Sequence, residues 1–151
     1  MPKVDRKLLS IKAEVVENLK KIIKAENVLD HEDQIRPFET DALSAYKQKP
    51  LAVVFPENTQ EVSKILAYCN QKRIKIVPRG AGTGLSGGAL PLMDGILLCL
   101  TKFNKIIEID YKNRCVVVQP GVTNLSITQA VEEKGFYYAP DPSSQIACSI
   151  G

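Results

Sequence analysis

The sequence predicts an α/β (α+β) fold, built on a small parallel βαβ sheet with flanking helices and preceded by an N-terminal helix. An apolar run at 51–55 ends at Pro56 and is typical of a buried strand. Apolar residues at helical spacing follow over 62–69, and a second strand pattern occupies 74–77. Because the links are short, the three segments form a βαβ unit whose strands run parallel.

The segment before this unit is expected to be helical and then irregular. Residues 7–25 carry apolar side chains at three- and four-residue spacings, which predicts one amphipathic helix. Residues 26–46 are polar, and Pro37 disfavours a long helix there. We therefore expect an N-terminal helical segment over 1–45 and a second domain over 46–151.

Other elements have recognisable boundaries. Asn58, with an acidic residue three positions later, resembles a capping box at the start of the helix in the βαβ unit. A helix over 124–134 has Thr123 or Asn124 as its cap and Gly135 as its stop. Three strands, the last two joined in a hairpin, are expected to extend the sheet or to pair at its edge, at 95–100, 105–110 and 114–118.

The basic charge of the chain is local. The formal net charge is +3, but residues 1–25 alone carry +4 and the remainder carries −1. Without a basic cluster after residue 25, the sequence disfavours nucleic-acid binding. The basic face of the N-terminal helix is expected to be solvated, with a membrane-surface or partner-binding face as the alternative.

Cysteine and histidine are too sparse for a metal site. His31 is the sole histidine, and no two cysteines have metal-ligand spacing. Cys69, Cys99 and Cys115 fall on predicted helices or strands and are expected to be core residues. The start of the chain does not resemble a secretory leader, and the longest apolar run, 96–100, is too short to span a bilayer. A cytoplasmic location is expected.

A glycine-rich loop directly follows the second strand of the βαβ unit. Five of the nine glycines fall within nine residues, namely Gly80, Gly82, Gly84, Gly87 and Gly88. Such a loop can turn successive backbone N–H groups toward one anion, with hydroxyl donors from Thr83 and Ser86 and a positive charge from Arg79. The alternative is a turn that only permits tight packing, but the density of glycine and hydroxyl residues favours phosphate binding.

Two familiar phosphate loops do not fit. Residues 82–87 match GxGxxG, and Glu108 lies near the distance of a ribose-binding acid, but Pro91 and Gly95 interrupt the helix that a Rossmann loop must open. The P-loop pattern fails because Gly88 stands where lysine is required.

Four motifs together resemble one family. They are the run 78–88, Gly121 within 118–122, the segment 138–144 and the segment 148–151. Their order and spacing resemble the N-terminal, FAD-binding domain of FAD-linked oxidases of the vanillyl-alcohol-oxidase (PCMH) type, most closely the glycolate oxidase D-subunit and D-lactate dehydrogenase group.

The resemblance implies which residues surround FAD. The pyrophosphate would lie against Pro78, Arg79, Gly80, Ala81, Gly82, Thr83, Gly84, Ser86 and Gly87. Pyrophosphate and flavin would also approach Pro140, Asp141, Pro142, Ser143, Cys148, Ser149 and Gly151. The sole histidine precedes the matched region, so FAD is expected to be held non-covalently.

The resemblance also implies a function for the complete protein. A FAD-dependent enzyme would oxidise a small 2-hydroxy acid such as glycolate or D-lactate and pass electrons onward, in one arrangement through a partner subunit near the membrane. The expected family motif continues beyond Gly151, so the chain is interpreted as truncated and inactive alone, with no catalytic or metal-binding residue assigned. The alternatives are another FAD-dependent reaction, such as alkyl transfer or reduction of a cell-wall precursor, and a non-catalytic fragment.

Overall fold

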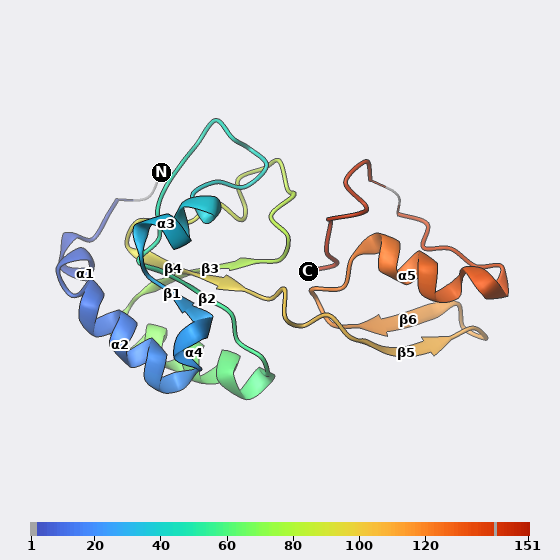
Figure 1. Cartoon of the computed structure of the whole chain (residues 1–151), viewed down its shortest axis with the longest axis horizontal. Helices are drawn as coiled ribbons and strands as arrows, with labels where there is room; N and C mark the ends of the chain where they lie inside the picture. The colour runs from blue at the N-terminus through green and yellow to red at the C-terminus, as the bar shows by residue number, and fades with distance from the viewer. Residues whose placement is uncertain (1–2, 141) are drawn as a thin grey trace. The chain divides into compact units, whose positions relative to one another are not determined.

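The computed structural model describes residues 3–140 and 142–151 (Figure 1). The chain forms two compact units. Unit 1 comprises the residues up to Pro78 together with Gly84–Cys99, and unit 2 comprises Arg79–Thr83 and Leu100–Gly151. The domain boundary expected after residue 45 stays a prediction.

The sheet of unit 1 has four strands in the order β1-β2-β4-β3. The strands are β1 (Val28–Leu29), β2 (Ala52–Val54), β3 (Lys75–Arg79) and β4 (Gly95–Cys99). β2 and β4 run parallel, with Val53 opposite Leu97, whereas β1 is antiparallel to β2. The predicted α/β fold is confirmed. The prediction that the strand after the glycine loop extends the edge of the sheet is wrong, because β4 lies between the two strands of the βαβ unit.

The direction of β3 follows from contacts at both of its ends. The backbone carbonyl of Lys75 approaches Gly95, so that a Cβ added at Gly95 would lie 2.8 Å from that oxygen. At the other end, Leu100 N–H donates to the carbonyl of Arg79 at 2.9 Å. The first residues of β3 and β4 therefore lie side by side, and so do their last residues, which makes the two strands parallel.

Helices cover both faces of this sheet, which explains why its central strands are apolar throughout (Figure 1). α3 (Glu32–Ile35) lies on one face, where Ile35 packs with Val53 and Leu97. α2 (Lys12–Ile22) and α4 (Thr59–Lys72) lie on the other (Figure 1). The predicted cap of α4 is confirmed, since Asn58 Oδ1 accepts the N–H of Glu61 at 2.9 Å.

The N-terminal segment differs from the single helix predicted over 7–25. It forms α1 (Arg6–Ser10) and then α2, which are separated at Ile11, where the backbone leaves helical geometry at φ −106° and ψ 17°. The segment 26–46 also contains β1, which the sequence did not reveal because a two-residue strand is too short for a periodic pattern.

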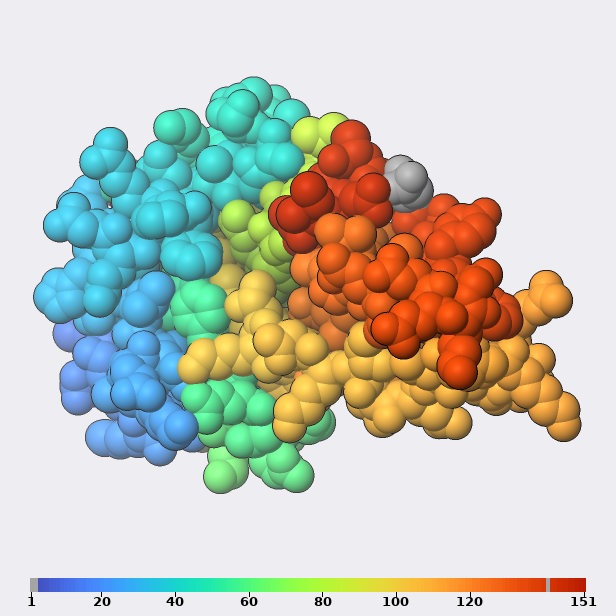
Figure 2. All heavy atoms as spheres, turned by 45° about the vertical axis from the view of Figure 1, so that its right-hand side comes forward, coloured from blue at the N-terminus to red at the C-terminus, as the bar shows by residue number. Residues whose placement is uncertain are grey.

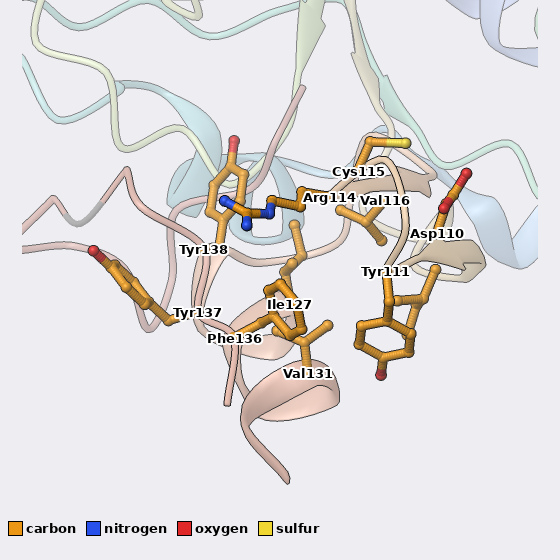
Figure 3. A pocket seen from close by; sticks show the side chains of 11 residues that line it. Asp110, Tyr111, Arg114, Cys115, Val116, Ile127, Val131, Phe136, Tyr137 and Tyr138 are labelled. Carbon is orange, nitrogen blue, oxygen red and sulfur yellow. The ribbon is translucent and has the colours of Figure 1, made fainter. Parts of the chain in front are cut away.

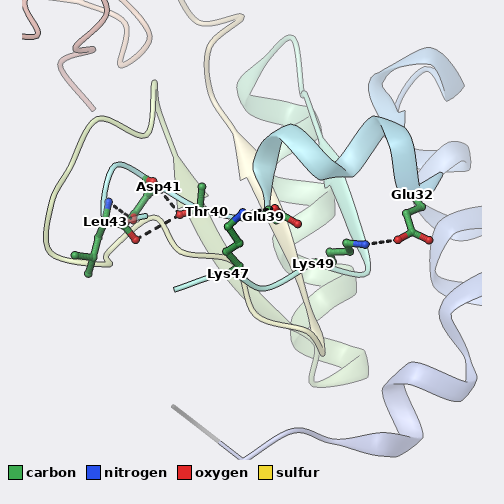
Figure 4. A network of polar contacts seen from close by, with 7 residues as sticks. All are labelled: Glu32, Glu39, Thr40, Asp41, Leu43, Lys47 and Lys49. Carbon is green, nitrogen blue, oxygen red and sulfur yellow. Dashed lines mark hydrogen bonds and ion pairs between the residues drawn. The ribbon is translucent and has the colours of Figure 1, made fainter. Parts of the chain in front are cut away.

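Polar contacts fix the irregular chain of 39–49 in unit 1 (Figure 4). Asp41 Oδ1 accepts the N–H of Leu43 at 2.9 Å, and Lys47 pairs with Glu39 at 3.1 Å. Lys49 pairs with Glu32 on α3. These contacts hold a segment without regular secondary structure against the elements around it.

Unit 2 contains a hairpin and a helix. β5 (Ile106–Asp110) and β6 (Cys115–Val118) pair antiparallel, which confirms the predicted hairpin. They form a separate two-stranded sheet, so the prediction that these strands extend the sheet of the βαβ unit or pair at its edge is wrong. α5 (Asn124–Val131) continues into the 3-10 turn Glu132–Lys134. Thr123 caps α5, and Gly135 ends the turn in the left-handed region at φ +75°, so both predicted boundaries are confirmed.

Candidate functional site

The glycine-rich loop starts where β3 ends, at Arg79, and leads to β4 without any helix between residues 80 and 94. The exclusion of a Rossmann dinucleotide loop is therefore confirmed. The division between the two units passes through this loop, with Arg79–Thr83 in unit 2 and Gly84–Gly88 in unit 1. Each half is described by itself.

In unit 2, the C-terminal motif 148–151 is bound to the start of α5 and the segment before it. Asn124 N–H donates to Cys148 O at 3.0 Å, and Ser149 forms a β-bridge with Thr123. The N–H groups of residues 150 and 151 donate to carbonyls of residues 122 and 120 at 2.9 and 2.8 Å. These main-chain bonds make 148–151 a fixed extended segment, and its last residues lie at the surface of unit 2 (Figure 2).

That segment passes directly behind the first glycine of the loop. A Cβ at Gly80 would lie 2.0 Å from the carbonyl oxygen of Gly151 and 2.1 Å from Ser149 Oγ. No side chain fits at this position, so the chain itself requires glycine there. Next to it, Ser149 Oγ accepts the N–H of Ala81 at 2.9 Å and donates to the carbonyl of Gly151 at 3.0 Å.

The second glycine of the loop, Gly82, lies against the side chain of Arg79. Gly82 has φ +75°, and a Cβ there would lie 2.3–2.5 Å from the guanidinium of Arg79. Glycine therefore permits both the left-handed turn and the close approach of a positive charge to the loop backbone. The sequence placed Arg79 near this site, and within unit 2 the two residues are in contact.

The backbone donors of this half remain available to a ligand. Within the described residues, no hydrogen bond is formed by the N–H of Gly80, Gly82 or Thr83. A left-handed residue such as Gly82 is one of the two halves of an anion-binding nest, in which neighbouring N–H groups turn toward one anion. Free amides beside a guanidinium fit a diphosphate, so the residues present suit the expected cofactor.

The half of the loop in unit 1 is less constrained by the chain. Nothing lies within 4 Å of a Cβ added at Gly84 or Gly88, and both residues are exposed. Gly87 has φ +73° and faces Leu43 at 3.7 Å, within the segment 39–49 described above. Ser86 is exposed. Pro78, the last residue of β3 that belongs to unit 1, is exposed as well.

The proline-rich motif lies beside α5. Buried Asn124 donates to the carbonyl of Pro140 at 3.3 Å, and its Oδ1 has no hydrogen-bond partner within the described residues. Pro142 O accepts the N–H of Gln145 at 2.8 Å, and Ser143 is exposed. Asp141, also predicted to bind the cofactor, lies outside the described residues.

A cavity of about 440 Å³ lies elsewhere in unit 2, between the β5–β6 hairpin and α5 (Figure 3). Apolar side chains of both elements line it together with Arg114, three tyrosines and Phe136, and Phe136 stacks on Tyr111 with ring centroids 5.5 Å apart. None of the predicted site residues lines it. The core position expected for Cys115 is wrong, because this residue is exposed at the cavity, at the start of a two-stranded sheet with one open face.

The burial expected for two of the cysteines is confirmed. Cys69 and Cys99 are buried, and burial raises the pKa of Cys69 to about 12. His31 is exposed at the start of α3. Within 3–140 and 142–151, no three His, Cys, Asp or Glu side chains gather as a metal ion would need. Over the same residues, no helix has the length and apolarity to cross a bilayer.

Sequence reasoning named Gly121 without assigning it a role. A Cβ there would lie 2.7–3.0 Å from the carbonyls of Leu100, Thr101 and Phe103. Gly121 therefore lets the segment that binds 148–151 pass close to the chain leaving β4. The pairing of Ser149 with Ala81 was missed altogether, because a contact between residues 68 positions apart leaves no local pattern.

The chain is similar in sequence to several known proteins. The chain is 49% identical over all 151 residues to the glycolate oxidase subunit GlcD of Escherichia coli (strain K12), of which it covers 29%. It is 36% identical over 135 residues, 89% of the chain, to D-lactate dehydrogenase of Anaerostipes hadrus, of which it covers 28%. The chain thus spans less than a third of the length of these relatives.

The chain is also similar in fold to solved structures. Over 87% of the chain, the fold matches 26% of p-cresol methylhydroxylase with a TM-score of 0.72 and 27% sequence identity. Residues 50–151, about two thirds of the chain, match the protein family described as "FAD binding domain". This chain belongs to that family, and FAD is its cofactor.

Proposed function

We propose that the chain binds FAD non-covalently, with the diphosphate against the glycine-rich loop, and that it is part of a 2-hydroxyacid dehydrogenase or oxidase. The proposed pyrophosphate residues are Pro78, Arg79, Gly80, Ala81, Gly82, Thr83, Gly84, Ser86 and Gly87. Those proposed along the pyrophosphate and flavin are Pro140, Asp141, Pro142, Ser143, Cys148, Ser149 and Gly151.

One observation carries the proposal for the loop. In unit 2, the N–H groups of Gly80, Gly82 and Thr83 are unbonded, and Gly82 lies against the Arg79 guanidinium. Ser149 and Gly151 pack against the start of the same loop, at Gly80. Backbone donors backed by a fixed segment need little reorganisation when an anion binds, which favours affinity. The charge of Arg79 adds a charge-assisted hydrogen bond to a phosphate oxygen.

The activity of the whole protein is proposed from the relatives. Glycolate oxidase subunit GlcD and D-lactate dehydrogenase are named for 2-hydroxy acids, and the first is named as a subunit. FAD held by these residues would supply a hydride acceptor: the acid would lose the hydride of carbon 2 and its hydroxyl proton, giving a 2-oxo acid and reduced FAD. We propose that a partner subunit then receives the electrons. Four cysteines without a disulfide fit a cytoplasmic protein, which we propose reaches a membrane only through such a partner.

A ligand series tests the diphosphate site. FAD, FMN and riboflavin share the flavin ring, but only FAD carries a diphosphate, so the chain should bind FAD at least tenfold more tightly than riboflavin. Arg79→Ala should weaken FAD about tenfold, the effect of losing one charge-assisted hydrogen bond, and should leave riboflavin unchanged. Arg36→Ala, at an exposed position in unit 1, is the matched control. Equal affinity for the three flavins would contradict the site.

The activity is tested on the complete protein. Glycolate or D-lactate, added without oxygen, should bleach the yellow flavin absorbance within the enzyme's turnover time, whereas the L-isomer of lactate should not. A flavoprotein that none of several 2-hydroxy acids bleaches would refute the proposed reaction and leave FAD binding intact.

A further inference from the structure

The back of the glycine-rich loop holds a hydroxyl that forms two hydrogen bonds. Ser149 Oγ accepts the N–H of Ala81 at 2.9 Å and donates to the carbonyl of Gly151 at 3.0 Å. The donor of this hydroxyl and one of its two acceptor lone pairs are therefore engaged within the chain. The Ala81 N–H is correspondingly absent from the set of unbonded loop amides.

The backbone of Ser149 is fixed independently of the loop. The β-bridge to Thr123 and the flanking bonds from Asn124 to Cys148 and from Ile150 to Val122 set its position along α5 and the preceding segment. A hydroxyl on such a fixed backbone can determine where Ala81 lies. Since Gly80 has no room for a Cβ on this side, the loop meets the segment along two consecutive residues.

We propose that Ser149, one of the residues proposed along the pyrophosphate and flavin, acts there as a positioning residue: its hydroxyl stays bonded to the loop and sets the conformation of Arg79–Thr83 for the diphosphate. This inference rests on the proposed function of the loop. With Ala81 tied to Ser149 and Gly80 packed on Gly151, the unbonded N–H groups of Gly80, Gly82 and Thr83 are held in place before a ligand arrives. Support of this kind, behind the residues that touch a ligand, decides how well a binding geometry is held.

The test compares three variants of the 151-residue chain by FAD titration and thermal unfolding. Ser149→Ala should weaken FAD three- to tenfold, the effect of losing one hydrogen bond that organises the site, and Ser149→Thr, which keeps the hydroxyl, should restore most of the affinity. Ser63→Ala removes an exposed hydroxyl from α4 in unit 1 and should change nothing.

Amide hydrogen exchange of the wild-type chain supplies a readout that FAD affinity alone does not. If Ser149 positions the loop, the Ala81 N–H is already protected without FAD and stays protected when FAD binds, and Ser149→Ala abolishes that protection. Loss of protection on adding FAD would mean that the hydroxyl turns to the cofactor, and unchanged FAD affinity in Ser149→Ala would mean that the bond is irrelevant to binding. Either result would overturn the positioning role of Ser149 and leave the proposed FAD site intact. A wild-type chain with a protected Ala81 amide and no affinity for FAD would overturn the proposed function together with the positioning role.

Discussion

Replacing single loop glycines by alanine separates what the fold requires from what the cofactor requires. In Gly80→Ala the new methyl group would lie 2.0 Å from the carbonyl oxygen of Gly151, well inside van der Waals contact. The N–H of the same residue donates to Pro120 at 2.8 Å and its oxygen accepts from Ser149 Oγ at 3.0 Å, so moving this oxygen away would disturb both bonds. Overpacking costs about 1–3 kcal/mol, and the loss of the bond between Ala81 and Ser149 adds about 1 kcal/mol.

The expected cost of Gly80→Ala is therefore about 3 kcal/mol, which lowers the Tm of a chain of this length by roughly 6–12 °C. Gly84→Ala is the matched control. Its methyl group would meet nothing within 4 Å, so the Tm should stay within about 2 °C of the wild type. If a diphosphate lies against this glycine, the same methyl should reduce FAD affinity by at least tenfold.

Thermal unfolding followed by circular dichroism and FAD titration followed by flavin fluorescence measure the two effects. A Gly80→Ala chain that melts with the wild type would refute the close approach of the 149–151 segment. A Gly84→Ala chain that binds FAD normally would show that the cofactor does not reach the half of the loop in unit 1.

Three further predictions concern unit 1 and the cysteines. Burial alone would raise the pKa of Asp94, but hydrogen bonds from Lys75 Nζ and the N–H of Asp5, each 2.6 Å long, lower it below its usual value. The ionised carboxylate therefore stabilises the fold above the pKa of unfolded aspartate, and this stability is lost as the pH falls through the lowered folded pKa. Asp94→Asn should lower the free energy of unfolding by about 2 kcal/mol at pH 7. In urea unfolding at a series of pH values, the variant should lose less stability than the wild type as the pH is lowered. Because the pKa of the Cys69 thiol is raised to about 12 and Cys99 is buried, iodoacetamide at neutral pH should label exposed Cys115 long before either, as peptide mass spectrometry can show. Asn58→Ala removes the cap of α4 and should lower the free energy of unfolding by about 1 kcal/mol, whereas Asn70→Ala, exposed in the last turn of the same helix, should cost less than half as much.

Local signals in the sequence were sufficient for most of the elements. The cap at Asn58, the stop at Gly135 and the turn between β5 and β6 depend on residues a few positions apart, and the structure has each of them. The order of strands does not depend on neighbours in sequence. Nothing in residues 95–99 states that they enter between β2 and β3, because an apolar strand buried on both faces reads the same at any interior position.

The sequence predicted the burial of Cys69 correctly and that of Cys115 wrongly, and the difference has a physical reason. Cys69 and Cys115 have similar apolar neighbours in sequence, yet one is buried in α4 and the other is exposed. α4 packs its face on a four-stranded sheet, whereas β6 belongs to a hairpin with a single covered face, so the alternate residues Cys115 and Val117 remain open. The number of layers around an element decides the outcome, and periodicity within the element does not encode it.

The glycine-rich loop combines two kinds of constraint that look identical in sequence. Gly80 and Gly121 are required by backbone atoms of the chain itself, since a side chain at either would overlap Gly151 or the carbonyls after β4, and Gly82 is favoured by its left-handed φ of +75°. Gly84 and Gly88 have negative or extended φ and open space around them, so the chain gives no reason for glycine at either. A glycine that the fold does not need, in a loop with several unbonded N–H groups, is explained most simply by the close approach of a ligand to the protein backbone. The unexplained glycines therefore support the phosphate site more directly than the glycine count that first suggested it.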